Sequence, residues 1–148
     1  MNFSKFGRLS GAFAIAVVVI SGSALASRAS APRDLKDVMS DMGGVAKALS
    51  KQMTNRDQNA DSATKVEAIR GFIQEALPIE PEKVAAIADK TARKIEFLEY
   101  QKSISALYGL CSELQQNFLA NDNEKAGKTF TLIRDAQKQG HDRFRIPE

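Results

Sequence analysis

The feature that most constrains the fold is the spacing of apolar residues after residue 34. Apolar side chains recur at three- and four-residue steps in four segments, and each segment therefore presents one apolar stripe, as an amphipathic helix does. Alanine, leucine, lysine, glutamate and glutamine dominate the same region, and these residues favour helices over strands. The pattern predicts an all-α protein without a sheet.

The first two helices have visible boundaries in the sequence. The first is expected over about 32–53, although the glycine pair 43–44 should interrupt it. The polar stretch 54–63 is expected to be a loop. Thr64–Glu67 then forms a capping box, which predicts the start of a second helix that ends before the extended connector 78–81.

Two more helices complete the predicted fold. The third is expected from near Glu82 to an Asn-Asp-Asn turn, with a bend or a change of packing partner near Leu98. Asn121 or Asp122 is expected to cap the fourth helix, which should end before Pro147. Four amphipathic helices with short connections predict an antiparallel up-down-up-down four-helix bundle over residues 32–148.

Residues 1–26 are typical of a secretory signal peptide. A basic start is followed by the short apolar run 11–20 and by small residues up to Ala26. Cleavage is expected after Ala26, with Ala31 as the alternative. An uncleaved membrane anchor is the other interpretation, but the run is shorter than the roughly 20 residues that span a bilayer. The mature chain is therefore expected in the periplasm and without membrane contact.

Charge and motifs exclude several classes of function. Without Lys5 and Arg8, 19 of the 21 basic residues remain against 18 acidic ones. The mature chain therefore lacks a basic stripe of the kind that nucleic-acid binding requires. The single cysteine, Cys111, excludes an intramolecular disulfide and is expected to be a buried, inert thiol. Motifs of hydrolases, phosphate loops, ordinary zinc sites and di-iron bundles are absent from the sequence. The chain is not expected to be an enzyme.

One chemistry needs only one histidine, and His141 is the only histidine in the chain. Haem iron takes an imidazole on one side and often a thioether on the other. In the predicted bundle the start of the first helix lies beside the end of the fourth. This arrangement brings Met39 or Met42 level with His141, whereas Met53 lies at the far end. Both Met39 and Met42 remain candidates for the second ligand.

Two short motifs at opposite ends of the chain resemble one family. The stretch DLKDVM (34–39) and the closing HDRFR (141–145) are similar to cytochrome b562. The ending also resembles the related cytochromes c′, whose last helix carries two cysteines that attach haem covalently. Gln137 and Gly140 stand at those two positions here. The resemblance therefore implies haem b, held without a covalent bond.

The resemblance also implies a function and its site residues. Met39 falls on the family's methionine ligand, His141 on its histidine ligand, and Arg145 on the arginine near a haem propionate. We expect a periplasmic b-type cytochrome that carries single electrons to or from a redox partner protein that the sequence does not identify, as a monomer or a weak dimer. Two alternatives remain: a five-coordinate gas-binding haem protein like cytochrome c′, and a haem-free helical bundle with a binding or chaperone-like role.

Overall fold

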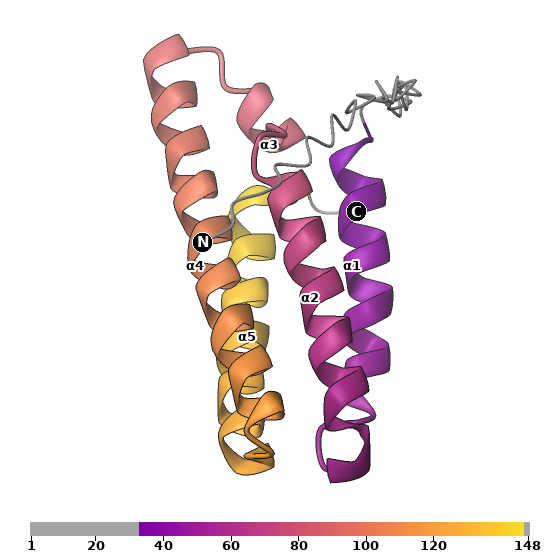
Figure 1. Ribbon diagram of the computed structural model, residues 1–148. Coiled ribbons are helices and arrows are strands. Elements are labelled where there is room, and N and C mark those ends of the chain that lie inside the picture. The colour runs from indigo at the N-terminus through magenta and orange to yellow at the C-terminus, as the bar shows by residue number, and fades with distance from the viewer. Residues whose placement is uncertain (1–32, 147–148) are drawn as a thin grey trace, which may run out of the picture. The chain divides into compact units, whose positions relative to one another are not determined.

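The structure, a computed structural model, describes residues 33–146, and the predicted signal peptide lies outside this range. The described residues form helices joined by short connections, and they contain no strand (Figure 1). The prediction of an all-α fold is therefore confirmed. The elements are α1 (Leu35–Ser50), the short 3-10 helix η1 (Arg56–Gln58), α2 (Asn59–Ala76), α3 (Glu82–Ala85), α4 (Lys90–Leu119) and α5 (Asn123–Phe144).

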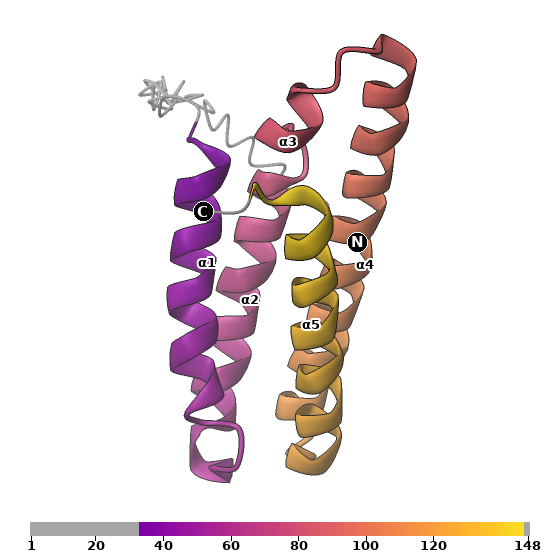
Figure 2. The same ribbon diagram turned by 180° about the vertical axis from the view of Figure 1, so that it is seen from behind.

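The four long helices pack as a bundle. α1 packs on α2, α2 on α4, and α4 on α5, while the short α3 packs on α4. Figures 1 and 2 show these helices side by side from two opposite directions. The backbones of α1 and α5 make no comparably close contact within residues 33–146. Side chains from both helices instead meet across the space between them.

Side-chain contacts show which helix ends lie together. At one end, which we call the Arg143 end, three contacts join successive helices. Their heavy atoms are 3.4, 3.0 and 2.7 Å apart, and the pairs are Arg33–Glu75, Tyr100–Ala76 and Arg143–Glu96. The start of α1, the end of α2, the first half of α4 and the end of α5 therefore share this end.

A cluster of three asparagines, of which Asn59 is buried, holds the opposite end, which we call the Asn59 end. The side-chain amide of Asn59 donates hydrogen bonds to the Oδ1 atoms of Asn121 (3.0 Å) and Asn123 (2.9 Å). Asn123 in turn donates to the backbone carbonyl of Met53 at 2.8 Å. Asn121 has a positive φ of 56°, a conformation that asparagine tolerates better than most residues. The cluster ties the connection after α1 to the start of α2 and to the α4–α5 turn.

The predicted start of α2 is wrong. The helix begins at Asn59 rather than after Thr64, and the Thr64 hydroxyl donates to the carbonyl of Ala60, one turn back, instead of capping a helix. Polar residues occupy the buried face of this first turn because Asn59 and Ser62 find hydrogen-bond partners there. The stretch looked like a loop because those partners come from distant parts of the chain.

The predicted third helix is also divided. α3 ends at Ala85 and α4 begins at Lys90, because Asp89 accepts a hydrogen bond from the backbone N–H of Ala92 at 2.7 Å and caps a new helix. The break therefore precedes Leu98, and α4 continues through that position. Likewise, α1 runs unbroken through the glycine pair 43–44.

The apolar stripes meet in a single core. The largest fully buried apolar side chains come from α1, α2, α3 and α4, and they are Val38, Leu49, Val66, Ile73, Val84, Cys111, Leu114 and Phe118. The end of α2 before Pro78 and the cap of α5 on Asp122 are both confirmed. Within residues 33–146, none of the helices combines the length and the apolar character that a membrane span requires.

Candidate functional site

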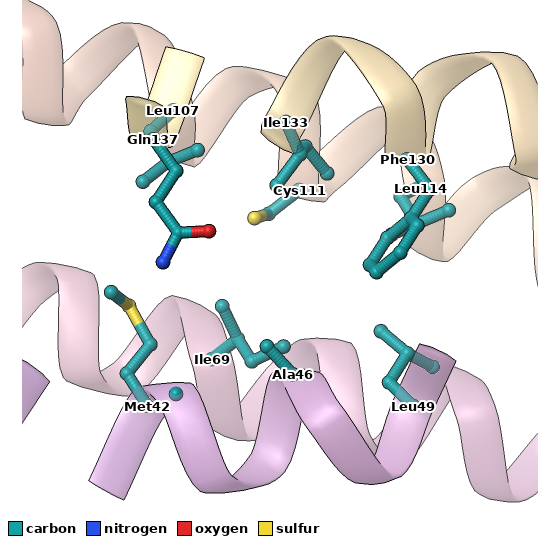
Figure 3. Close-up of a pocket in the computed structure, with 11 residues that line it drawn as sticks. Met42, Ala46, Leu49, Ile69, Leu107, Cys111, Leu114, Phe130, Ile133 and Gln137 are labelled. Carbon is teal, nitrogen blue, oxygen red and sulfur yellow. The ribbon is translucent and has the colours of Figure 1, made fainter. Parts of the chain in front are cut away.

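A small apolar pocket lies where side chains of the four long helices meet. It has a volume of about 30 Å³, which is room for one or two water molecules. Figure 3 shows Met42, Ala46 and Leu49 on one side and Ile133, Phe130 and Cys111 on the other. The remaining lining residues are Gly43, Ile69, Leu107, Leu114 and Gln137.

Helical spacing explains the pocket's lining. Met42, Ala46 and Leu49 are three or four residues apart and share one face of α1. Phe130, Ile133 and Gln137 do the same on α5. Gln137 is the one polar side chain of this lining, and its amide points toward the Met42 side chain in Figure 3. The sequence analysis did not single out Gln137 as a pocket residue.

The three predicted site residues do not line this pocket. Met39 is half-buried and packs against the core from α1. His141 is exposed in the last turn of α5, and Arg145 follows the helix, with its backbone N–H donating to the carbonyl of His141 at 3.0 Å. The candidate that lines the pocket is Met42, which is 7% exposed.

Met39 and His141 nevertheless lie one helical turn beyond the pocket. Met39 precedes Met42 by three residues, and His141 follows Gln137 by four. Such spacings place residues on the same face of a helix. Met42 and Gln137 face each other across the pocket, so Met39 and His141 lie on the next turn of α1 and of α5, toward the Arg143 end.

The residues that follow His141 hold the last turn of α5 in place. The Phe144 ring packs edge-on against Tyr100, with ring centroids 5.4 Å apart. The Arg143 guanidinium donates to both carboxylate oxygens of Glu96, at 2.7 and 3.0 Å. His141 makes no side-chain hydrogen bond or ion pair with any residue in the range 33–146. Its position is fixed by its neighbours, while its imidazole is left without a competing partner.

Electrostatics distinguish the possible ligands. Burial raises the pKa of the Cys111 thiol to about 11, so the thiolate that binds metals is not formed near neutral pH. The hydrogen bond from Arg143 is the main cause that lowers the pKa of Glu96, and this carboxylate is therefore already paired. Among residues 33–146, no group of three or more histidine, cysteine, aspartate or glutamate side chains is placed to hold a metal ion.

Two glycines flank the opening. A Cβ atom built on Gly43 or on Gly140 would meet no other atom within 4 Å. Neither glycine is therefore explained by close packing of two helices. Gly43 lines the pocket beside Met42, and Gly140 directly precedes His141. The same is true of the other described glycines, so the space around these two does not by itself set them apart.

The donor chemistry of Met39 and His141 suits haem. A thioether and an imidazole are an established ligand pair for haem iron, and each of the two residues lies one turn beyond a residue of the pocket lining. The pocket of about 30 Å³ does not itself hold a porphyrin, since pockets for ligands of that kind measure several hundred Å³. The fit therefore concerns the turn beyond the pocket, where α1 and α5 are not closely packed.

Comparisons with known proteins give no family for this chain. No model of a protein family matches it, and no curated protein and no solved structure matches it either. The functional argument therefore depends on the residues themselves.

Proposed function

We propose that the protein is an exported b-type cytochrome that carries single electrons in the periplasm. Its four long helices form an up-down-up-down bundle, and Met39 and His141 are the axial ligands of a non-covalently bound haem. The contacts of the Arg143 end support this topology, because they join the start of one helix to the end of the next.

One observation carries the proposal. The pocket between α1 and α5 brings Met42 and Gln137 face to face, and Met39 and His141 occupy the next turn of the same two helices. We infer that the thioether and the imidazole of these two residues share one haem. The exposed His141 has no partner within residues 33–146 to compete with a metal.

The chain's own residues have separate tasks in this proposal. Met39 and His141 hold the iron, and two filled axial positions leave none open for oxygen or another substrate. Arg145, four residues after His141, supplies positive charge for a propionate. Gly43 and Gly140 leave space for the flat ring. Bound haem supplies a one-electron Fe(III)/Fe(II) couple, whose potential thioether ligation raises.

A second candidate function is a haem-free helical bundle that binds another molecule. The exposure of His141 and the small volume of the pocket favour it. In this case Met39 and His141 have no common ligand, and substitutions at the two positions have independent, small effects on stability.

Absorption spectroscopy after addition of hemin tests both candidates. The test uses residues 31–148, which form one compact unit with its own core. We expect sharp reduced bands that do not respond to carbon monoxide, as six-coordinate iron gives. Met39→Ala should give a high-spin form that binds carbon monoxide, because one axial position is opened. His141→Ala should lose the six-coordinate spectrum.

Two matched variants provide the controls. Met42→Ala should leave the spectrum nearly unchanged, and Met53→Ala should leave it unchanged because Met53 lies at the Asn59 end. If Met42→Ala alone opened the axial position, the ligand would be Met42. A carbon-monoxide response of the unmodified chain would indicate the gas-binding alternative. If the protein kept no Soret band after free hemin was removed, haem function would be excluded.

A further inference from the structure

The first half of α4 carries two large apolar side chains that nothing in residues 33–146 covers. Ile95 is 57% exposed and Leu98 is 54% exposed. No residue from Lys90 to Glu99 is buried, and the buried face of the helix begins only at Tyr100. Figures 1 and 2 show these turns at the outer edge of the bundle, with α3 beside them.

Three exposed lysines surround this apolar pair. Lys94 and Lys102 each lie one helical turn from Leu98, Lys90 lies one turn before Lys94, and Ile95 directly follows Lys94. Lys90 and Lys94 make no hydrogen bond or ion pair within the described residues. Lys102 approaches only Glu99, at 4.0 Å, and its side chain is 79% exposed. We call Lys90, Lys94, Ile95, Leu98 and Lys102 the α4 crest.

The acidic residues near the α4 crest are already engaged. Asp89 caps the helix through the N–H of Ala92. Glu96 accepts two hydrogen bonds from Arg143, and Glu99 lies 3.5 Å from the same guanidinium. The crest is therefore positively charged. A second copy of the chain does not suit it, because an isologous contact would set lysines against lysines.

The chemistry of the α4 crest favours lipid over an acidic protein. Tryptophan, tyrosine and arginine anchor most protein interfaces, and lysine is depleted there; the crest has lysines and none of those anchors. Aliphatic side chains rimmed by lysines are the usual means by which a helix binds an anionic bilayer surface. A long lysine stem also keeps its ammonium at the headgroups while an apolar neighbour is buried.

We propose that the α4 crest binds the surface of an anionic membrane. Ile95 and Leu98 enter between the headgroups, and the three lysines contact lipid phosphates. The sequence alone led us to expect no membrane contact after signal cleavage, because the only long apolar run, 11–20, belongs to the predicted signal peptide. The proposal does not depend on haem binding, so either can fail without the other.

Co-sedimentation with lipid vesicles tests the proposal, using residues 31–148 without hemin. The probe is a phosphatidylcholine vesicle that contains about 30 mol% phosphatidylglycerol, compared with pure phosphatidylcholine. We expect binding to the anionic vesicles only, and we expect about 0.5 M salt to reduce it strongly, because the Debye length then falls well below 10 Å.

Substitutions separate the electrostatic contribution to vesicle binding from the apolar contribution. Lys90→Gln, Lys94→Gln and Lys102→Gln together should weaken binding about 100-fold, given the usual contribution of a lysine near a charged bilayer. Ile95→Asn with Leu98→Asn should weaken it at least about tenfold. All five side chains are exposed, so the variants should fold, and circular dichroism checks this.

The matched controls lie on other helices. Leu132→Asn removes an apolar side chain that is 52% exposed on α5, and Lys36→Gln, Lys47→Gln and Lys138→Gln remove three exposed lysines; all should bind as the unmodified chain does. The proposal is overturned by an absence of binding to anionic vesicles, by equal binding to neutral ones, or by control variants that lose as much. It is also overturned if Ile95→Asn with Leu98→Asn binds normally.

Discussion

Tyr100 and Cys111 are the two titratable side chains that are buried within residues 33–146. Both lie on the core face of α4. Burial raises the pKa of Tyr100 to about 12 and that of Cys111 to about 11, because the charged form of each loses its hydration. The Tyr100 hydroxyl remains satisfied, since it donates to the carbonyl of Ala76 at 3.0 Å.

We predict that the contribution of Tyr100 to the free energy of unfolding decreases at alkaline pH. Its pKa in the folded protein is raised above the ordinary value near 10. Its stabilising contribution is therefore complete below about pH 10 and is lost as the pH rises toward about 12. Tyr100→Phe should cost about 1 kcal/mol at neutral pH through the lost hydrogen bond. Urea denaturation of both proteins at neutral pH and at about pH 11 measures the difference.

The sign of this pH effect is the decisive result. The gap in free energy of unfolding between Tyr100→Phe and the unmodified protein should shrink at the higher pH. A gap that grows with pH would mean that the folded protein stabilises the tyrosinate, and would contradict the burial of this side chain.

Helix capping decides where α4 begins. Asp89 holds an extended conformation before Lys90, and its carboxylate accepts from the N–H of Ala92. The apolar pattern of 82–98, taken without this cap, predicts one continuous helix, and the sequence analysis expected one. The cap therefore separates α3 from α4 and sets the point where α4 turns away from α3.

We predict that removal of this cap destabilises the protein. Asp89→Ala should lower the free energy of unfolding by about 1 kcal/mol, the usual cost of losing a helix N-cap. Asp89→Asn is the matched control, because the asparagine side chain also caps helices well. Urea denaturation gives both values. Equal losses for the two variants would show that charge, rather than the capping hydrogen bond, holds the start of α4.

At the scale of the whole molecule, the two ends of the bundle are built differently. Ion pairs and aromatic contacts join the helices at the Arg143 end, where salt screens exposed charges. The Asn59 end depends on neutral amides that bond around the buried Asn59. Breaking the hydrogen bonds of a buried amide costs more than breaking an exposed ion pair. The candidate site thus lies at the end with the more exposed contacts.

We predict that Asn59→Ala strongly destabilises the fold. It removes the side chain of the one buried asparagine and the three hydrogen bonds that this side chain makes with Asn121 and Asn123, at a cost of about 2–3 kcal/mol. The exposed neighbour Gln58, whose side chain makes no capping bond, is the control, and Gln58→Ala should change stability by less than about 0.5 kcal/mol. Thermal unfolding compares them. Similar values for the two variants would mean that the asparagine cluster contributes nothing.

Helical spacing in the sequence determined most of the fold. Three features depend on neighbours within a few residues: the apolar stripe of α1, the end of α2 before Pro78 and the cap of α5 on Asp122. Local sequence patterns are sufficient to predict such features. The same spacing led us to expect Met39, Met42 and His141 at the same level of the first and last helices. Whether they hold haem remains a prediction.

Only the tertiary structure decided the rest, because it depends on residues far apart in the chain. Asn59 is buried within a helix since Asn121 and Asn123 supply its hydrogen bonds. Met42 and Gln137 line the pocket, while His141 is exposed, because side-chain burial depends on how α1 and α5 are spaced. Ile95 and Leu98 have the spacing of core residues, yet no helix covers them. An apolar stripe shows which face of a helix can be buried. Only the packing of the helices determines which part of that face is covered.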